Sequence, residues 1–174
     1  MATQKFKAAV QFIVNECKDN PGRLGATRLN KALWFADTVA FKMNGAAITG
    51  ESYVKRDKGP VPAHILATID ELKAEGKIVV MEPQFRFDTR KFIPDGPLDY
   101  SHLSDDEREI LKAVVDTVCG YTATEISDET HDMIWEAASD GETIPLSATL
   151  VSDKGSITDA MRAWADTQIS KLAA

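Results

Sequence analysis

The sequence predicts a mostly helical α+β domain with a small β-hairpin. Apolar residues recur at helical spacing in several segments, Ser or Thr precedes Glu by three positions at two helix starts, and short β-branched or aromatic runs follow the third helix. With 174 residues, of which 44% are hydrophobic and 27% charged, the chain is long enough to bury a core. We therefore expect one domain over residues 1–174.

The first two helices are predicted from apolar spacing. Over residues 3–18 the apolar side chains form one stripe, made by Phe6, Ala9, Val10, Ile13, Val14 and Cys17. Pro21 and Gly22 end this helix. A second helix, expected over residues 24–43, is apolar around most of its circumference and ends before Gly45. Such a helix is typically central and buried.

The next segment predicts a third helix and a hairpin. Pro60 and Pro62 are expected to introduce the helix, because proline suits a first helical turn. Residues 78–81 and 85–87 read as two strands around Pro83. Three helices followed by a hairpin is the order of a winged-helix arrangement, so a winged-helix-like topology is one expectation for this domain.

The remaining helices are predicted from their caps. Ser104 with Glu107, and Thr122 with Glu125, fit the capping box, in which two side chains satisfy free backbone amides at a helix start. The helix after Thr122 is expected to end near the third histidine, and a last helix is expected from residue 156.

The charge distribution is asymmetric within a net charge of −7. Residues 1–100 carry 15 Lys and Arg against 12 Asp and Glu, whereas residues 101–174 carry 5 against 15. This argues against nucleic-acid binding by the whole surface. The acidic, helical C-terminal part is compatible with a face for a basic partner protein or with a solvated surface that keeps the protein soluble.

The residues that could carry chemistry are sparse. His64, His102 and His131 are not spaced as zinc ligands, and no Gly-rich phosphate loop or nucleophile elbow occurs. Cys17 and Cys119 lie in apolar stripes, which predicts buried free thiols. We expect no enzyme activity, no metal and no cofactor. A hydrolase built on His131 is an alternative.

The location of the protein is predicted from hydropathy. No apolar run approaches the roughly 20 residues that a membrane-spanning helix needs. The N-terminus shows an amphipathic pattern in place of a signal peptide. We expect a cytoplasmic protein that does not bind membranes.

Three separated motifs carry most of the functional information. They are the aromatic-rich helix of residues 28–36, the Lys58-Gly59-Pro60-Val61-Pro62 turn, and the segment from Thr130 to Trp135. Judged by its local chemistry alone, the first motif is a core element and the second is a helix-entry turn. The third is a histidine held at a helix C-terminus with an aromatic ring behind it.

A functional interpretation of the second motif is a partner-binding ridge. Lys55, Arg56 and Lys58 would form an exposed basic ridge beside a rigid turn made by Gly59 and Pro60. A rigid turn lowers the ordering cost of binding, so the ridge would suit an acidic partner surface.

In combination, these motifs resemble the Panacea-domain antitoxins, the SocA-like proteins of bacteria and their phages, over residues 24–140. The run Leu29-Asn30-Lys31-Ala32-Leu33-Trp34-Phe35-Ala36 is similar to the family's Leu-x-Lys-Leu-Leu-Tyr-Phe-Ala pattern. Gly59-Pro60-Val61 and the run from Ile126 to His131, with Trp135, match as well. The resemblance implies an antitoxin that binds and neutralises a cognate toxin protein, with His131 and Trp135 as family-defining, partner-binding positions.

The resemblance also implies a connection to proteolysis. The C-terminal Leu172, Ala173 and Ala174 look like tails that the ClpX unfoldase engages. Some members of the family look like adaptors that deliver a toxin to the ClpXP protease. The alternative is a plain helix end.

The alternative function is a winged-helix DNA-binding transcriptional regulator. The third helix would enter the major groove, and Arg86, Arg90 and Lys91 of the hairpin would contact phosphates. Against this, Asp70 and Glu71 would repel the DNA backbone. We therefore expect no DNA partner.

Overall fold

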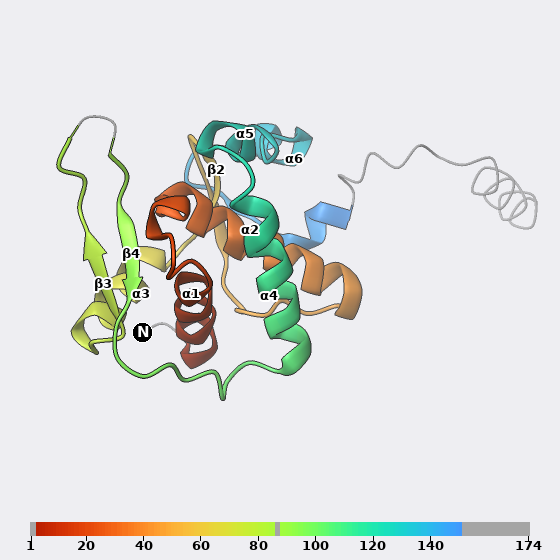
Figure 1. The fold of residues 1–174 in the computed structure, drawn as a ribbon. Helices are drawn as coiled ribbons and strands as arrows, with labels where there is room; N and C mark the ends of the chain where they lie inside the picture. Colours follow the sequence, from red (N-terminus) through yellow and green to blue (C-terminus); the bar gives the residue numbers. More distant parts are fainter. Residues whose placement is uncertain (1–2, 86–87, 151–174) are drawn as a thin grey trace, which may run out of the picture.

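The computed structural model describes residues 3–85 and 88–150 (Figure 1). The helices are α1 (Gln4–Glu16), α2 (Gly25–Asn44), α3 (Ile65–Ala74), α4 (Asp105–Val118), α5 (Ala123–Asp128) and α6 (Met133–Ala137), with 3₁₀ turns η1 (Pro21–Arg23) and η2 (Leu146–Leu150). The strands are β1 (Tyr53–Arg56), β2 (Gly59–Pro62), β3 (Ile78–Met81), β4 (Lys91–Pro94) and β5 (Thr143–Ile144). The mostly helical α+β class predicted from the sequence is confirmed.

Helix α1 lies at the centre of the molecule. In Figure 1 the β3–β4 hairpin and α3 lie on one side of it, and α2 and α4 lie on the other. All residues of the segment 6–14 are buried as a result, not only those on the predicted stripe. This burial includes Lys7, whose Nζ lies 2.7 Å from a carboxylate oxygen of Glu71 and 2.6 Å from one of Glu75. Both carboxylates raise the pKa of Lys7, so this buried amine is paired.

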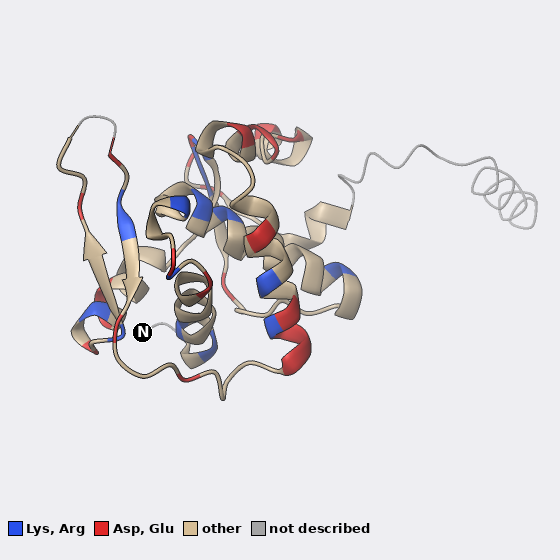
Figure 2. Cartoon of the chain, viewed as in Figure 1, with Lys and Arg blue, Asp and Glu red and all other residues tan. Residues whose placement is uncertain are grey.

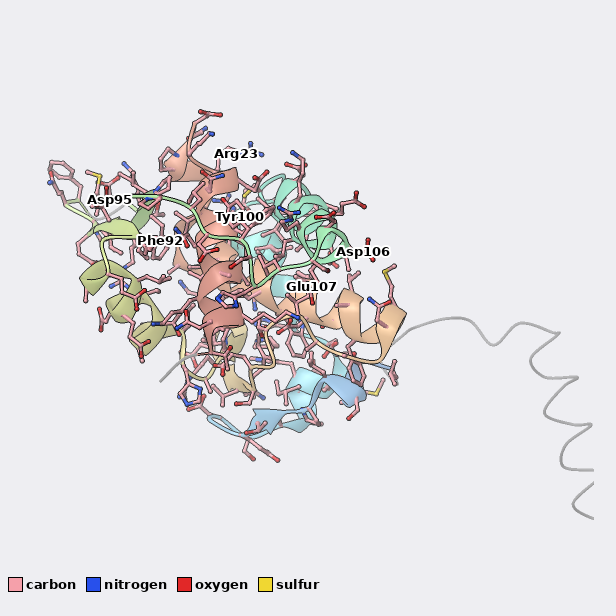
Figure 3. All side chains as sticks on the ribbon, turned by 90° about the horizontal axis from the view of Figure 1, so that it is seen from below. Arg23, Phe92, Asp95, Tyr100, Asp106 and Glu107 are labelled. Carbon is pink, nitrogen blue, oxygen red and sulfur yellow. The ribbon has the colours of Figure 1, made fainter. Side chains whose placement is uncertain are left out.

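The segment between β4 and α4 crosses α1, as the positions of Asp95, Tyr100 and Asp106 show in Figure 3. The side-chain amide of Gln11 donates a 3.2 Å hydrogen bond to the carbonyl of Pro97. The ring of Phe12 meets that of Tyr100 edge-on, with centroids 5.0 Å apart. These contacts attach an irregular segment to the core.

Helix α2 is the other buried helix, as its all-round apolar pattern predicted. Trp34 is 6% exposed and packs edge-on against Tyr53 of β1, with centroids 4.9 Å apart. One turn further, the buried carboxylate of Asp37 accepts hydrogen bonds from the hydroxyl of Tyr53 at 2.7 Å and from the amide of Thr49 at 2.9 Å. Burial raises the pKa of Asp37, and these donors oppose the shift. The network fixes β1 on α2.

The Gly59–Pro62 segment is a strand, so the expectation that Pro60 and Pro62 introduce a helix is wrong. Strand β2 pairs with β1 in antiparallel register and lies at the edge of a three-stranded sheet in the order β2-β1-β5. An edge strand tolerates prolines because half of its amides need no partner. Helix α3 begins only at Ile65.

The second hairpin uses a later strand than expected. Strand β3 matches the prediction, but it pairs with β4 at Lys91–Pro94 and not with residues 85–87. Phe92 is fully buried opposite Val80, whereas Phe85 is 77% exposed and outside any strand. Residues 86 and 87 lie outside the described residues. Because β1 and β2 separate α2 from α3, the order also differs from three helices followed by one hairpin.

The capped helices form as predicted. Both capping boxes are present, at Ser104 with Glu107 and at Thr122 with Glu125. The first turn of α4 contains Asp105, Asp106 and Glu107, seen as the red start of this helix in Figure 2. Their negative charges stabilise the positive end of the helix dipole. Helix α5 ends at Asp128, short of the predicted end near residue 131. The expected helix from residue 156 lies outside the described residues.

Candidate functional site

The three sequence motifs meet around one side chain, Lys31 of α2. Its Nζ donates a 2.6 Å hydrogen bond to the hydroxyl of Thr130. That hydroxyl donates to the carbonyl of Ser127 at 2.8 Å, and the hydroxyl of Ser127 donates to the carbonyl of Lys58 at 2.9 Å. A continuous chain of hydrogen bonds therefore joins α2, the end of α5 and the β1–β2 hairpin.

Gly59 allows the side chains of Lys31 and Thr130 to approach the β1–β2 hairpin closely. Its φ is +98°, a conformation that side-chain-bearing residues rarely adopt. A Cβ atom at this position would overlap the Nζ of Lys31 and the hydroxyl of Thr130. The glycine of the second motif is thus required by the close approach of the other two motifs.

Lys31 is a buried amine without a counter-charge. It is 1% exposed, and no ion pair to it forms among the described residues. Burial lowers the pKa of Lys31 to about 7, because the charged form loses its hydration. Lys7, whose two carboxylate partners raise its pKa, shows the usual arrangement for a buried lysine.

A polar pocket of about 490 Å³ lies beside Lys31. The first turns of α2, the β1–β2 hairpin and the loop before β5 form its walls. The lining residues are Ala26, Thr27, Asn30, Lys31, Arg56, Asp57, Lys58, Pro60, Val61 and Asp140. Their side chains carry three positive and two negative charges when Lys31 is protonated, so the pocket can attract an anion.

Trp135 holds the hairpin in place. Its indole Nε1 donates a 3.1 Å hydrogen bond to the carbonyl of Arg56, and its ring stacks on His131 with centroids 4.0 Å apart. The Nζ of Lys55 lies 4.1 Å from the ring centroid and donates to the carbonyl of Ala138 at 2.8 Å. The Nε2 of His131 is buried and has no hydrogen-bond partner among the described residues.

The proposed basic ridge is smaller than expected. Arg56 and Lys58 are exposed near the hairpin tip, but Lys55 turns inward onto the indole. Gly59 and Pro60 are buried in β2 and support the tip from below. The expectation of three exposed cations beside a turn is therefore wrong in two respects: one cation is engaged internally, and the turn is a strand.

His131 follows the C-terminal end of α5, where its backbone N–H donates a 3.1 Å hydrogen bond to the carbonyl of Asp128. The next residue, Asp132, begins α6 by accepting hydrogen bonds from the amides of Ile134 and Trp135. The aromatic ring expected behind His131 is present as the stacked Trp135. Lys31 and Thr130 lie in the first and third motifs, but neither was predicted to be a site residue. A lysine flanked by Leu29, Ala32 and Leu33 on the apolar side of a helix was the pattern that could have pointed to Lys31.

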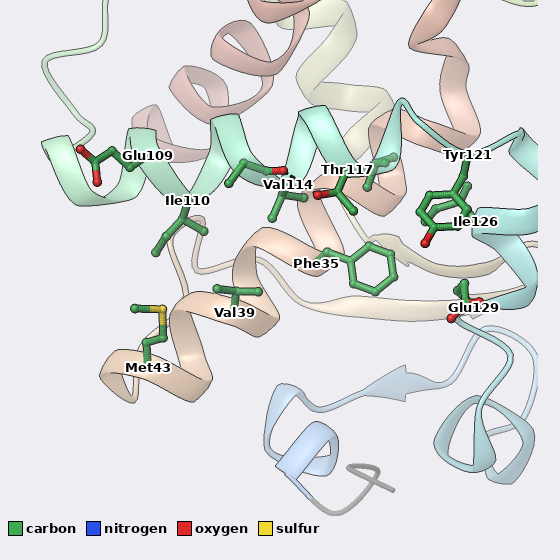
Figure 4. A pocket seen from close by; sticks show the side chains of 12 residues that line it. Phe35, Val39, Met43, Glu109, Ile110, Val114, Thr117, Tyr121, Ile126 and Glu129 are labelled. Atoms are coloured by element: carbon green, nitrogen blue, oxygen red, sulfur yellow. Dashed lines mark hydrogen bonds between the residues drawn. The ribbon is translucent and has the colours of Figure 1, made fainter. Parts of the chain in front are cut away.

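An apolar groove of about 610 Å³ lies between α2 and α4 and shares no lining residue with the polar pocket (Figure 4). Phe35, Val39 and Met43 line it from α2. Ile110 and Val114 line it from α4. Trp34 turns into the core, so the two aromatic residues of the first motif face different surroundings.

Cys17 and Cys119 are buried free thiols, as predicted. Their Sγ atoms lie 3.7 Å apart, a proximity that the sequence did not reveal. In the part of the chain that the structure describes, no three His, Cys, Asp or Glu side chains cluster as metal ligands would. Within the same residues, no helix has both the length and the apolar character to cross a membrane.

Fold and site define a small helical α+β domain in which the first two motifs line one polar pocket, and the third motif is hydrogen-bonded to α2 and to the β1–β2 hairpin beside it. A family model described as antitoxin SocA-like, Panacea domain, matches residues 29–136, which include all three motifs except Arg28 at the start of the first. The chain belongs to this antitoxin family, as the motif resemblance predicted. Comparisons with curated proteins and with solved structures gave no match.

Proposed function

We propose that this protein is the antitoxin of a toxin–antitoxin pair and neutralises a cognate toxin by binding it directly, without catalysing a reaction. The family match over the three motifs carries this proposal. The residues of these motifs bond to one another across the fold, and none is arranged as a nucleophile with its general base. Their arrangement supports a binding surface, and we propose that the protein acts in the cytoplasm.

The β1–β2 hairpin tip is the proposed contact region. Arg56 and Lys58 are exposed there, while Trp135 and Ser127 hold the backbone carbonyls of these two residues. A surface that is already ordered loses little conformational entropy on binding, so more of the contact energy contributes to affinity.

Co-expression with the neighbouring gene product tests the proposal. We expect the wild-type chain to restore growth in cells that produce the toxin, and the Arg56→Glu/Lys58→Glu variant to lose rescue and co-purification. Lys73→Glu, on the exposed side of α3 with 46% of its side chain accessible, is the matched charge reversal and should rescue normally. Failure of the wild-type chain to bind or rescue would reject the antitoxin assignment. Equal rescue by all variants would reject the hairpin tip as the contact.

We further propose that the chain acts as an adaptor that delivers the toxin to ClpXP. This rests on the Leu172, Ala173 and Ala174 tail, which lies outside the described residues. An Ala173→Asp/Ala174→Asp variant should bind the toxin with unchanged affinity but lengthen the toxin's half-life in cells that contain ClpXP. An unchanged half-life would separate neutralisation from proteolysis and leave occlusion as the mechanism.

DNA binding receives little support from the third helix. Glu71 of α3 and its C-cap residue Glu75 pair with Lys7 on α1, and Asp70 pairs with Lys73 on the exposed side. This helix therefore has no excess of positive charge with which to bind the phosphate backbone. We therefore propose a protein partner and not a DNA partner.

A further inference from the structure

The charges around the polar pocket leave one cation uncompensated. Arg56 faces Asp140, with 3.8 Å between Nη1 and Oδ1. Asp57 and Lys58 add one charge of each sign at the hairpin tip. Lys31 has no such counterpart, and its amine is held in place by Thr130 alone among the described residues.

The start of α2 adds to the positive potential. This helix has 20 residues, its N-cap residue Leu24 makes no side-chain capping bond, and its first turn contains no acidic residue. Ala26 and Thr27 of that turn line the pocket. The first amides of a helix have no partner within it and carry the positive end of its dipole. They offer hydrogen-bond donors to an anion on the same side as Lys31.

We propose that this pocket is a carboxylate-binding site that receives one acidic side chain of a protein partner, with Lys31 as its counter-charge. The identity of that partner as the toxin rests on the proposed function, but the carboxylate site does not. A buried ammonium group without a partner costs free energy, and a carboxylate seated beside it removes that cost. The free-energy cost of burying the Lys31 amine without a counter-charge is thus removed only in the complex.

The charge balance favours a carboxylate over a phosphate. One uncompensated cation matches a monoanion, whereas Asp57 and Asp140 in the same walls would repel a dianion. The net charge of −7 also disfavours nucleic acid as the source of the anion. An Asp or Glu side chain of a protein meets both conditions.

Titration of the full-length protein with small anions tests this site. The probes are sodium acetate and inorganic phosphate, with sodium chloride at equal ionic strength as the control, and the readout is the NMR signal of the Lys31 Cε carbon in protein labelled at lysine. We expect acetate to shift this signal saturably and to raise the pKa of Lys31 by at least one unit. Chloride should do neither.

Substitution localises the effect. Lys31→Met, which keeps the length and removes the charge, should abolish saturable acetate binding measured by line shapes of the Ala26 and Thr27 amides. The control Lys73→Met removes an exposed lysine from α3 and should bind as the wild type does. An acetate response equal to that of chloride, or one that persists in Lys31→Met, would overturn the proposal. Phosphate binding at least tenfold tighter than acetate would also overturn it, in favour of a phosphate site.

Binding of the toxin gives a second test, which is independent of the acetate titration. If the neighbouring toxin binds, Lys31→Met should weaken the complex at least tenfold, as should neutralising one particular Asp or Glu of the toxin, and the two losses should not add. Acetate binding without toxin binding would reject the proposed function and keep the site. Toxin binding without acetate binding, or full additivity of the two losses, would reject the site and keep the function.

Discussion

The Nζ of Lys31 lies 2.6 Å from the hydroxyl of Thr130, 99 residues further along the chain. This bond joins the first and third motifs of the family across the second, because Gly59 leaves room for it. An amine in this position is costly for the isolated protein and useful to a partner that brings a carboxylate. The buried charge of Lys31 therefore destabilises the isolated protein, whereas hydrogen bonds hold together the segments around it.

Replacement of Lys31 should stabilise the isolated protein. The pKa of Lys31 is about 7 in the fold, against 10.5 for an ordinary lysine, so the unfolded chain binds a proton that the folded chain does not between these values. Stability should rise with pH from about 7 to 10.5 and stay level below 7. In Lys31→Met this rise should vanish, and the free energy of unfolding at pH 6 should increase by roughly 1–3 kcal/mol.

Urea unfolding at several pH values measures this effect. The other charged residues that line the pocket are the same in the wild type and in Lys31→Met; they are Arg56, Asp57, Lys58 and Asp140. The difference between the two curves therefore reports Lys31. A difference that is independent of pH would contradict the burial of an uncompensated amine.

Gly59→Ala should destabilise the protein more than a glycine substitution without a steric neighbour. The new methyl group would displace the Nζ of Lys31 from Thr130, in addition to the strain of a positive φ. We expect a loss of about 2–4 kcal/mol. Gly50→Ala has a similar positive φ with no atom within 4 Å, and should lose only about 1 kcal/mol. Equal losses in thermal unfolding would show that the contact with Lys31 is unimportant.

Trp135→Ala should loosen the hairpin tip. The change removes the stacking with His131, the contact with Lys55 and the bond to the carbonyl of Arg56. We expect a loss of roughly 2–3 kcal/mol and faster trypsin cleavage after Arg56. The matched truncation Phe85→Ala, at an exposed ring, should change the stability by less than about 0.5 kcal/mol. Trypsin cleavage at the wild-type rate would exclude Trp135 as the support of the tip.

Tyr53→Phe should lower the stability of the protein, because Asp37 loses a hydrogen-bond donor. The substitution removes a buried donor at 2.7 Å from the carboxylate while keeping the ring contact with Trp34. The expected loss is about 1–2 kcal/mol in denaturant unfolding. Tyr121→Phe removes a hydroxyl from an exposed ring and should be nearly neutral. A neutral Tyr53→Phe would mean that Asp37 needs only its bonds from Thr49.

Mild oxidation should link Cys17 to Cys119. The hydrogen bond from Cys17 lowers the pKa of Cys119, and Arg23 and Arg28 add to this effect. The thiolate needed for exchange should therefore form first on Cys119. Treatment with diamide should give an intrachain disulfide, seen as the loss of two hydrogens by mass spectrometry, and a higher thermal midpoint, because the link spans 102 residues. Cys17→Ser should show neither change, and intermolecular dimers in the wild type would contradict the geometry.

Local chemistry explains what could be predicted of the fold. Helices α1 and α2 begin and end within two residues of the predicted bounds, and both capping boxes are present. Strand β2 was not predicted, because a Gly-Pro-Val-Pro segment has the local preferences of a turn and becomes a strand only by pairing with β1. The partner strand of β3 was predicted at residues 85–87, but the register pairs β3 with Lys91–Pro94 and buries Phe92 in place of Phe85.

The candidate site was predicted in part. The sequence motifs indicate the hairpin residues Arg56 and Lys58 and the pair of His131 and Trp135, but they do not reveal the contacts around these residues. Lys55 was expected to be exposed, but the distant Trp135 attracts it. Long-range partners of this kind leave no periodic pattern along the chain.

The sequence by itself determined the helical class, the ends of α1 and α2, the two capping boxes and the three family motifs, because caps and apolar spacing act over a few neighbouring residues. Only the tertiary structure decided that Lys31, Gly59 and Thr130 meet, and that no carboxylate from residues 3–85 or 88–150 pairs with Lys31 there. Burial and pairing depend on which segments pack together, and that packing is set by the whole chain at once.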